Sequence, residues 1–336
     1  MSSSEKMRAI EIKTPGGPEE LAVTQTTKPY AYPGQVLIKV KAAGINRPDI
    51  LQRKGLYPAP DGASPLPGLE VSGIVEAIGR TTDQTPTSLQ VGDEVIALTN
   101  GGGYAEYVSV PWGQVLPKPK GWSFAEAATI PETFFTIQQT LIDRGKPTAE
   151  DWVLVHGGSG GIGATAIQLA KLAGAKVLTT ASTDEKLSYC KEMGADVTIN
   201  YMTEDFVERT KAETGTGANI IVDFIGGDYV DRNLRAAAPD GTIIQLANLA
   251  GREATVTMGL VVAKRLTLFG STLRAQPDDV KARIGHNLME QVLPAIENGT
   301  IKKPKLKTFP MEDAPKAHEA MDAQDHIGKI VLEMGT

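Results

Sequence analysis

The sequence predicts a two-domain α/β protein in which a strand-rich, barrel-like part accompanies a doubly wound parallel sheet. Three observations predict this class. The chain of 336 residues is long enough for about two domains of roughly 100–200 residues each. Its first third reads as short strands separated by turns, and its middle alternates strand and helix patterns. A glycine-rich loop stands between the first strand and the first helix of that alternation.

Short strands dominate the first third of the chain. Residues 39–43 and 105–110 alternate in polarity, and residues 71–78 are β-branched and bounded by glycines. Gly and Pro clusters, such as those at residues 15–18 and 65–68, mark the turns between strands. Many short strands with such turns predict an antiparallel, barrel-like domain.

Strands and helices alternate from residue 152 onward. The first predicted helix has apolar residues at helical spacing and ends at Gly174. The second predicted helix ends at Gly194. This alternation predicts a parallel sheet with helices on both faces. We predict strands at residues 152–155, 176–180, 220–222, 242–244 and 329–332, and helices at residues 162–173, 184–193 and 288–297.

Composition and charge exclude several classes of protein. The formal charge of −6 argues against a nucleic-acid groove, which needs a positive surface. No run approaches the ~20 apolar residues of a transmembrane helix, and the start lacks the pattern of a secretion signal. The single cysteine, Cys190, makes neither an internal disulfide nor a cysteine-rich zinc site. We therefore expect a cytoplasmic protein that binds neither nucleic acid nor membrane, with Cys190 packed as a small apolar group.

The sharpest local signal is a G-x-G-x-x-G loop that follows the strand at 152–155 and opens a helix. Glycines let the backbone turn tightly and let a pyrophosphate approach, and the helix N-terminus then offers free N–H groups and partial positive charge. The loop therefore predicts dinucleotide binding, with a tight structural turn as the plainer alternative. Its residues are Gly158, Ser159, Gly160, Gly161, Ile162 and Gly163.

The same loop also satisfies the G-x-S-x-G pattern of a hydrolase nucleophile, with Ser159 at its centre. That mechanism needs an acid and then a histidine further along the chain. The histidines that follow are His286, His318 and His326, and the last two lie in a polar stretch without an obvious loop setting. A phosphate-binding hydroxyl is therefore the favoured role of Ser159, and labelling by a serine-reactive probe tests the alternative.

The end of the second strand indicates which dinucleotide is bound. NAD binders place Asp or Glu there, about 20 residues after the loop, to bind the ribose diol, whereas this chain has Ala181. A carboxylate ~4 Å from a 2′-phosphate would cost on the order of 4 kcal/mol per charge pair at an effective dielectric of about 20. Ala181 removes that repulsion, and Ser182 and Lys186 are suited to bind the phosphate, so we predict NADPH. Asp184 and Glu185 oppose this prediction and are interpreted as first-turn helix acids.

Motifs outside the glycine loop add a second and more specific signal. They lie at residues 43–49 (AGINRPD), 52–57 (QRKGLY), 68–73 (GLEVSG), 91–95 (VGDEV) and 328–332 (GKIVL). With the loop, they make nearly the whole chain resemble the medium-chain dehydrogenase/reductase superfamily, and most closely its zinc-independent, zeta-crystallin-like quinone oxidoreductases. The resemblance implies a GroES-like barrel-type substrate domain at residues 1–130 and 276–336, and a Rossmann dinucleotide-binding domain at residues 131–275.

Two substitutions relative to the zinc-dependent members bear on the chemistry that the resemblance implies. Asn46 stands where those relatives have a ligand Cys, and Leu69 where they have a ligand His. Zinc lowers the pKa of bound water by roughly 9 units, or on the order of 12 kcal/mol, whereas one hydrogen bond to a charged group supplies ~1.5–3 kcal/mol. The resemblance therefore implies no metal site and an acceptor that is already electrophilic, a quinone or a conjugated enone.

The resemblance also implies which residues form the site. Tyr57 and Asn46 should line a cleft between the domains near the nicotinamide, with Tyr57 donating to the acceptor oxygen. The plainer alternatives are a rim aromatic for Tyr57, a turn residue for Asn46 and surface charge for Lys329, while Asp49 and Glu70 are expected to be structural anchors. Besides the glycine loop, Ser182 and Lys186, the implied cofactor contacts are Thr136, Tyr201, Leu246, Asn248, Leu273, Arg274 and Lys329.

The resemblance thus implies an NADPH-dependent quinone oxidoreductase. The alternatives are an NADPH-dependent reductase of 2-alkenals or enones in the same fold, and a nucleotide-fold binding protein without turnover. Residues 265–270 resemble the edge strand through which such proteins pair two subunits, so we expect a homodimer. The sequence identifies neither the natural acceptor, nor a one- or two-electron product, nor the pathway.

Overall fold

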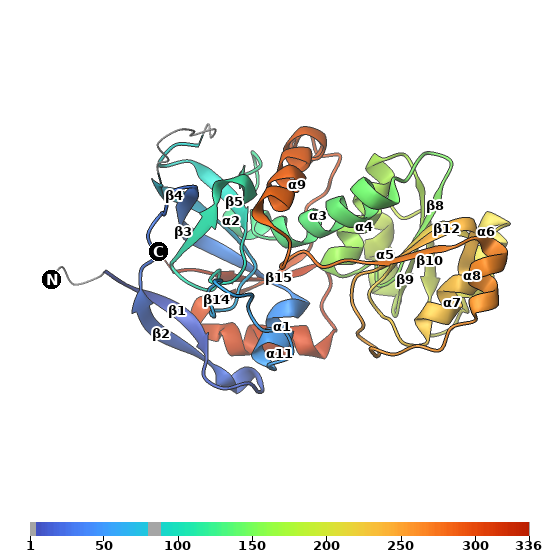
Figure 1. Ribbon diagram of the computed structural model, residues 1–336, viewed down its shortest axis with the longest axis horizontal. Helices are drawn as coiled ribbons and strands as arrows, with labels where there is room; N and C mark the ends of the chain where they lie inside the picture. Colours follow the sequence, from blue (N-terminus) through green and yellow to red (C-terminus); the bar gives the residue numbers. More distant parts are fainter. Residues whose placement is uncertain (1–4, 80–88, 336) are drawn as a thin grey trace. The chain divides into compact units, whose positions relative to one another are not determined.

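The chain folds into two compact units. The computed structural model describes residues 5–79 and 89–335. Unit 1 consists of Met1–Phe135 and Arg274–Thr336, and unit 2 of Thr136–Leu273. Helix α3 (Pro131–Ile137) carries the chain from unit 1 into unit 2 (Figure 1). In the described residues, no helix combines the length and the apolar character that crossing a bilayer would require.

Unit 1 is built on a sheet in the order β14-β15-β3-β4-β5-β7, with β6 paired to β3. The β14–β15 pair is parallel, the other neighbours are antiparallel, and β1 and β2 form a separate antiparallel pair. The predicted strand-rich first third is confirmed. The strands are β1 (Lys6–Ile12), β2 (Leu21–Thr27), β3 (Gln35–Ile45), β4 (Glu70–Ile78), β5 (Glu94–Leu98), β6 (Tyr107–Pro111), β7 (Val115–Pro117), β14 (Leu306–Pro310) and β15 (Lys329–Glu333).

Strand β3 fills the core of unit 1 because apolar and polar side chains alternate along it. Ile38 and Val40 are buried on either side of the exposed Lys39, as the two-residue period of a strand requires. Buried residues of β4, β5 and helix α11 (Ala314–Ala323) pack in the same core. Gly73 of β4 permits a close strand contact, since a Cβ there would lie 2.2 Å from the carbonyl oxygen of Lys39.

The helices of unit 1 correct one prediction. The single helix predicted at residues 288–297 is wrong in extent, because α9 (Asp278–Gln291) ends and α10 (Leu293–Glu297) begins on either side of Val292. Pro294 explains the break, since proline has no N–H for the helix ladder and its ring clashes with the carbonyl four residues earlier, that of Glu290 in α9. The other helical segments are α1 (Arg47–Arg53), α2 (Phe124–Ala127), and the 3₁₀ turns η1 (Pro18–Glu20), η2 (Trp112–Gln114) and η4 (Met311–Asp313).

Unit 2 is a parallel sheet in the order β10-β9-β8-β11-β12-β13. Chain progression reverses between β8 and β11, so their carboxyl ends flank the switch point at which doubly wound folds bind ligands. The four strands predicted between residues 152 and 244 all lie in this sheet, and the predicted fold class is confirmed. The strands are β8 (Trp152–Val155), β9 (Lys176–Ala181), β10 (Val197–Asn200), β11 (Ala218–Asp223), β12 (Ala237–Gln245) and β13 (Thr267–Gly270).

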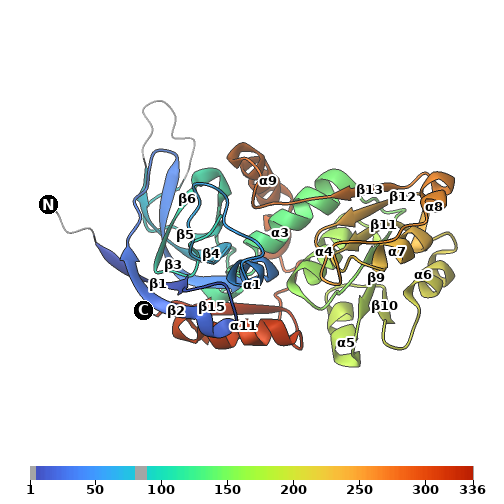
Figure 2. The same cartoon turned by 60° about the horizontal axis from the view of Figure 1, so that its bottom comes forward.

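Helices connect the parallel strands of unit 2 (Figure 2). The two predicted helices are present as α4 and α5, and the sequence patterns missed the others. Apolar residues from the strands and from α6 and α7 share one core. The segments are the π-helical η3 (Gln138–Gly145) and the α-helices α4 (Gly161–Leu172), α5 (Asp184–Glu192), α6 (Phe206–Thr214), α7 (Tyr229–Ala236) and α8 (Met258–Lys264).

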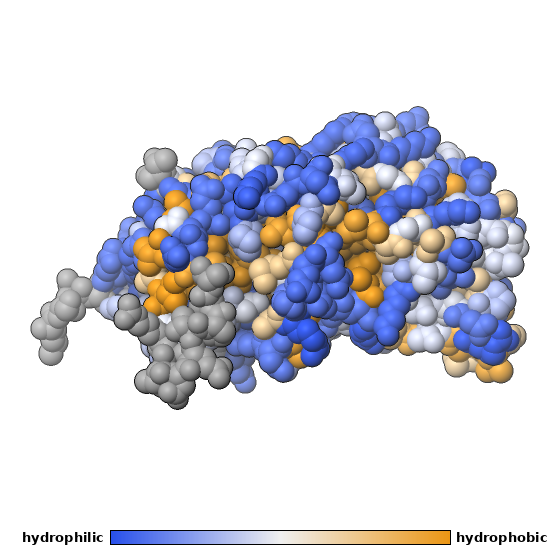
Figure 3. Space-filling model, turned by 90° about the horizontal axis from the view of Figure 1, so that it is seen from above, coloured by the Kyte–Doolittle hydropathy of each residue, from blue (hydrophilic) through white to orange (hydrophobic). Residues whose placement is uncertain are grey.

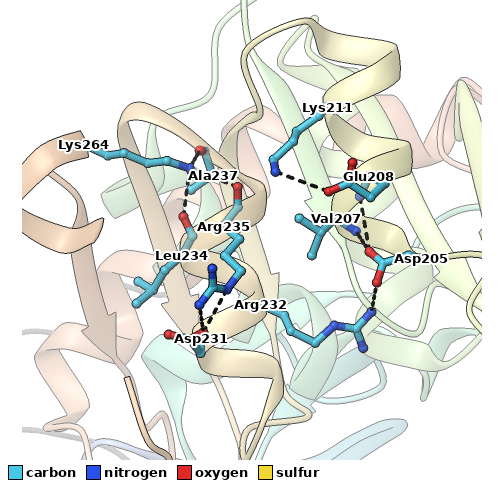
Figure 4. Close-up of polar contacts among 10 residues, drawn as sticks. All are labelled: Asp205, Val207, Glu208, Lys211, Asp231, Arg232, Leu234, Arg235, Ala237 and Lys264. Atoms are coloured by element: carbon cyan, nitrogen blue, oxygen red, sulfur yellow. Dashed lines mark hydrogen bonds and ion pairs between the residues drawn. The ribbon is translucent and has the colours of Figure 1, made fainter. Parts of the chain in front are cut away.

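Side-chain contacts tie α6, α7 and α8 together (Figure 4). Asp205 caps α6 and its second oxygen pairs with Arg232 of α7 at 3.2 Å. The ammonium of Lys264, at the end of α8, satisfies carbonyl groups that the end of α7 leaves without helical partners. It donates to the carbonyl oxygens of Leu234, Arg235 and Ala237 at 2.9, 3.0 and 2.6 Å.

The surface of the protein is largely hydrophilic on the face drawn in Figure 3, where apolar side chains are exposed among polar ones. Two of the large apolar side chains exposed in unit 2 are Val262 of α8, 75% exposed, and Leu268 of β13, 51% exposed. The single thiol is not among the exposed groups, because Cys190 is fully buried in α5 and burial raises its pKa to about 12. The prediction that Cys190 packs as a small apolar group is confirmed.

Candidate active site

The glycine-rich loop runs from the carboxyl end of β8 into helix α4, at the switch point of the sheet. Two of its glycines are required by close packing. A Cβ on Gly158 would lie 2.1 Å from Oγ1 of Thr179, and one on Gly163 would lie 2.3 Å from the carbonyl oxygen of Gly157. A Cβ on Gly160 would meet nothing closer than 3.9 Å, so a ligand has room to approach the loop there.

Helix α4 begins with backbone donors that no side chain caps. Its N-cap is Gly160, which leaves the first-turn N–H groups of Gly161, Ile162 and Gly163 for other acceptors. A helix of 12 residues also carries partial positive charge at this end. The buried Ser159 hydroxyl lies in the same loop. These residues fit the pyrophosphate of a dinucleotide, because they combine close backbone approach with unsatisfied N–H groups.

The residues predicted to surround a 2′-phosphate lie together at the carboxyl end of β9. Ala181 is the buried last residue of that strand, and the half-buried Ser182 follows it. Lys186 is half-buried in the first turn of α5. The backbone N–H of Tyr201 donates to the carbonyl oxygen of Ala181 at 3.2 Å, and the Tyr201 side chain is 42% exposed. Ser182 and Tyr201 thus lie next to the end of β9 in the fold, and Lys186 lies one turn into the helix that follows.

The other residues predicted to contact the cofactor are divided between the units. Leu246 and Asn248 follow β12, so they lie at the same edge of the parallel sheet as the glycine loop. Thr136 is the first residue of unit 2 and lies in α3. Leu273 is the last residue of unit 2, whereas Arg274 and Lys329 belong to unit 1.

A buried histidine supports the loop, and the sequence patterns missed it. His156 directly follows β8 and is fully buried, and burial lowers its pKa. Asn233 donates through Nδ2 to Asp223, so its Oδ1 accepts from Nε2 of His156 at 2.8 Å. Nδ1 of the neutral ring then accepts from the hydroxyl of Thr180 at 3.2 Å, and that hydroxyl oxygen accepts from the N–H of Gly157. The ring thus fastens the start of the loop to neighbouring elements.

In unit 1, the two predicted catalytic residues lie in different settings, and Asn46 belongs to a buried ionic cluster. The Lys329 ammonium donates to Oδ1 of Asn46 at 2.6 Å, to Oε1 of Glu70 at 2.6 Å and to the carbonyl oxygen of Ile45 at 3.3 Å. Nδ2 of Asn46 donates to the same Glu70 oxygen at 2.8 Å. Lys329 is 4% and Glu70 0% exposed, so all three ammonium donors are used inside unit 1.

The neighbouring Asp49 holds two backbone segments in place. Its carboxylate accepts the N–H of Asn46 at 2.8 Å and the N–H of Gly68 at 3.0 Å, and it closes a capping box at the start of α1. Burial raises the pKa of Asp49 to about 6, although both N–H donors oppose that shift. The expectation that Asp49 and Glu70 act as anchors agrees with these contacts.

A hydrogen-bonded chain runs from Asp49 to the surface of unit 1. The guanidinium of Arg53 has no acceptor atom, so it donates to Nδ1 of His318 at 3.3 Å, and the neutral ring then carries its proton on Nε2. Nε2 donates to the Tyr104 hydroxyl at 3.3 Å, and that hydroxyl bonds Asp49. Arg53 also pairs with Asp322 at 2.7 Å. Burial lowers the pKa of His318 to about 3, and both its nitrogens are engaged, so it offers no base to Ser159.

The predicted donor Tyr57 lies beside a buried cation. The guanidinium carbon of Arg274 is 5.4 Å from the centre of the Tyr57 ring, and Arg274 is 5% exposed. Burial raises the pKa of Tyr57 above its ordinary value, so the hydroxyl keeps its proton at neutral pH. Tyr57 is half-buried, which leaves part of its side chain open to a ligand.

Glu132 is a further titratable group that sequence reasoning missed. It lies in the first turn of α3, and its backbone N–H donates to Oε2 of Glu70 at 2.9 Å. Burial, followed by the negative charges of Glu70 and Asp49, raises the pKa of Glu132 to about 8. The motif around Glu132 contains no charge pattern that announces this shift, because Glu70 and Asp49 are brought close only by the fold.

The metal-ligand pattern of zinc enzymes is not assembled in this part of the protein. Leu69, which stands where the zinc-dependent relatives have a ligand His, is buried, with 1% of its surface exposed. Within residues 5–79 and 89–335, no three His, Cys, Asp or Glu side chains are grouped so that they could hold a metal ion.

Comparison with known proteins identifies the family. The model of the alcohol dehydrogenase GroES-like domain matches residues 32–120, and the model described as zinc-binding dehydrogenase matches residues 161–288. A solved NAD-dependent alcohol dehydrogenase is 33% identical, with a TM-score of 0.85 and coverage of 98% of this chain and 100% of that chain. The chain belongs to the medium-chain dehydrogenase/reductase superfamily.

Family members with different named activities resemble this chain. The quinone oxidoreductase of Mus musculus is 28% identical over 99% of both chains. A solved mycobacterial protein complexed with NADPH is 30% identical, with a TM-score of 0.84 and coverage of 97% and 99%. The solved CurK enoyl reductase is 28% identical, with a TM-score of 0.85 and coverage of 98% and 100%.

A phenolphthiocerol/phthiocerol polyketide synthase subunit of Mycobacterium tuberculosis is 29% identical over 97% of this chain, which spans only 15% of that relative's length. Family and fold together make the protein an oxidoreductase of this superfamily, with a dehydrogenase fold that binds a nicotinamide dinucleotide.

Proposed function

We propose that the protein is an NADPH-dependent quinone oxidoreductase that works without a metal ion. The observation that carries the proposal is the buried ammonium of Lys329, which lies 2.6 Å from both Asn46 and Glu70. This ammonium supplies the positive charge that balances Glu70. It also bonds Asn46, the residue that stands where the zinc-dependent relatives have a ligand Cys. A divalent cation there would repel this ammonium. The acceptor must therefore be one that takes a hydride without a Lewis acid.

The end of β9 supports NADPH as the hydride donor. Ala181 presents no carboxylate to a 2′-phosphate, and Ser182, Lys186 and Tyr201 supply polar groups beside it. One relative of known structure binds NADPH, whereas another is NAD-dependent. The 2′-phosphate is the group that separates the two cofactors, so these residues are the ones that would decide the preference.

The chain's own residues have distinct roles in this proposal. The bound dinucleotide supplies the hydride, and the glycine loop with the start of α4 binds its pyrophosphate. Tyr57, protonated at neutral pH, donates to the acceptor oxygen. Asn46 is oriented by Lys329 and Glu70, and it keeps one Nδ2 hydrogen for the acceptor because Glu70 takes only the other.

Turnover with matched acceptors tests the proposal. The expected result is that NADPH is consumed faster than NADH with 1,2- and 1,4-quinones, and that added chelator leaves the rate unchanged. Faster consumption of NADH contradicts the assignment of the β9 end. Reduction of 2-alkenals and enones but not quinones selects the second candidate, which the enoyl reductase neighbour favours. Binding of NADPH that no acceptor ever oxidises selects a protein without turnover.

We also propose that two copies pair through the outer edge of unit 2. Strand β13 is the last strand of the sheet and pairs with β12 on one side. Leu268 on β13 and Val262 on the neighbouring α8 are both more than half exposed. An open strand edge with exposed apolar side chains favours pairing with a second copy. Light scattering in solution tests this homodimer.

A further inference from the structure

Arg274 carries a buried N–H group that finds no acceptor among residues 5–79 and 89–335. Its Nε and Nη2 both donate to one carbonyl oxygen, that of Asn100, at 3.0 and 2.8 Å. Nη1 is buried, and no hydrogen-bond partner for it is present in the described part of the chain. Buried guanidinium groups are normally paired with acceptors. An unpaired one in a native structure therefore points to a ligand that supplies the missing oxygen.

The charges around Arg274 do not neutralise it. In the ranges that the structure describes, no carboxylate forms an ion pair with it, and the adjacent Lys281 is a second buried cation. Lys281 donates to Oδ1 of Asn100 at 2.6 Å and to the carbonyl oxygen of Arg274 at 2.8 Å, so its donors are directed into the fold. Asp49 and Glu132 act on Arg274 only through the longer-range field.

Glu132 adds little negative charge, because its pKa of about 8 keeps most of it protonated at neutral pH. Among the groups that surround Arg274, Asp49 is thus left as the main countercharge, and it is already engaged by two backbone N–H groups. The environment of Nη1 therefore favours an anionic or strongly polarised oxygen over a neutral ligand.

The position of Tyr57 indicates where that oxygen comes from. The Tyr57 ring lies 5.4 Å from the guanidinium carbon, within the range of a cation–π contact. A flat, conjugated acceptor that packs near this ring and bonds the Tyr57 hydroxyl would bring its own oxygens within reach of Nη1. The two side chains belong to the same unit.

We propose that Nη1 of Arg274 donates to the acceptor oxygen that becomes negative when the hydride arrives. The substrates are then compounds whose reduction yields a phenolate or an enolate. This inference rests on the proposed function. The C–H electron pair of the dihydronicotinamide goes to the acceptor with the hydrogen, and the oxidised coenzyme remains. The electron pair displaced within the acceptor becomes an oxyanion bound by Arg274, and a proton from water then gives the hydroquinone or the saturated ketone.

A chromophoric phenol tests this anion site without any turnover. The pKa of 4-nitrophenol bound to the protein is read from its absorbance during a pH titration. We expect the native protein to bind the phenolate about tenfold more tightly than the phenol, which lowers the pKa of the bound dye by about one unit. Arg274→Met should abolish this shift, and Arg274→Lys should retain part of it.

Arg283→Met is the matched control, because Arg283 is an exposed arginine on the same segment of unit 1. It should leave both the dye shift and NADPH affinity as in the native protein. If Arg274→Met does not fold, Arg274→Gln carries the test, since its amide can still donate to Asn100. An unchanged dye pKa in a folded Arg274 variant overturns the proposal. The proposal is also overturned if the Arg274 variant binds NADPH more weakly while the pKa of the bound dye stays as in the native protein. That result would make Arg274 a cofactor contact.

Acceptor kinetics separate this inference from the proposed function. With Arg274→Met, kcat/KM should fall about 10- to 100-fold, the range of one charge-assisted hydrogen bond, and it should depend more steeply on the pKa of the reduced acceptor. If the native protein reduces no quinone or enone, the proposed function fails while the dye titration still decides the anion site. If turnover is present and Arg274→Met leaves kcat/KM unchanged, the inference alone fails.

Discussion

Replacing Lys329 by methionine removes the cation that contacts the fully buried Glu70. The carboxylate would retain the Nδ2 of Asn46 at 2.8 Å and the backbone N–H of Glu132 at 2.9 Å, but no countercharge. Breaking a buried pair by removing one partner costs about 3–5 kcal/mol, because the remaining charge stays in a poorly solvating interior. We expect Lys329→Met to lower the free energy of unfolding of unit 1 by that amount.

Fluorescence can follow unit 1 separately from unit 2. Trp112 and Trp122 lie in unit 1, and Trp152 lies in unit 2. Urea unfolding in a Trp152→Phe background therefore reports on unit 1, and linear extrapolation gives its unfolding free energy. The midpoint should fall without a change in the slope, because a change in slope would indicate altered compactness rather than lost stability.

Two further variants decide whether charge burial is the cause. Lys13→Met, which changes an exposed lysine of unit 1, should cost less than ~0.5 kcal/mol. The double variant Lys329→Met, Glu70→Gln should recover a large part of the loss, because a neutral amide still accepts hydrogen bonds at low desolvation cost. A loss no larger than that of Lys13→Met, or a double variant no more stable than Lys329→Met alone, would refute the reasoning.

Four further experiments test the other assignments. Ala181→Asp should weaken NADPH far more than NADH in a fluorescence titration, with a ceiling of about 4 kcal/mol set by the charge pair. Gly163→Ala should destabilise unit 2, because its Cβ would lie 2.3 Å from a backbone oxygen, whereas Gly160→Ala, with 3.9 Å of clearance, should leave unit 2 stable and weaken nucleotide binding by filling the space that the ligand needs. Folding raises the pKa of Glu132 to about 8, so the folded state binds its proton more tightly and unit 1 loses stability as pH rises from about 5 to about 8. The shift from 4.5 to about 8 corresponds to roughly 5 kcal/mol at most, so Glu132→Gln should flatten much of that decline in urea titrations at several pH values. Leu268→Lys should convert a dimer into a monomer by light scattering, and unchanged mass would remove β13 as the contact.

The glycine loop was predictable from sequence because every requirement on it is local. The steric need for Gly158 and Gly163 arises from neighbours within the same strand–loop–helix unit and the next strand. The strands at 152–155 and 176–180 were predictable for the same reason, since apolar runs bounded by turns set their limits. The break at Val292 also has a local cause, because Pro294 lacks the N–H that a continuous helix needs.

The ionic cluster of unit 1 was not predictable from any such pattern. Glu70 and Lys329 are 259 positions apart, and they meet because β15 pairs with β3 next to Asn46. Glu132 similarly acquires its raised pKa from residues that are distant in sequence. The sequence shows which residues carry charge, but burial and countercharge are properties of the tertiary fold. The sequence therefore predicted Asn46 and Lys329 as site residues but not the hydrogen bond between them.

The two buried cations Lys329 and Arg274 have different roles in unit 1, because their hydrogen-bond contacts differ. Lys329 has no donor left, since Glu70, Asn46 and the backbone of Ile45 use all three, so its contribution to chemistry is to orient the Asn46 amide. Arg274 keeps Nη1 unpaired, so it is the cation that can respond to a new negative charge. The proposed metal-free reaction would need both functions, because orientation alone does not stabilise an oxyanion and a free cation alone does not fix the acceptor. Loss of Lys329 should therefore disturb acceptor orientation and stability together, whereas loss of Arg274 should act on the developing charge.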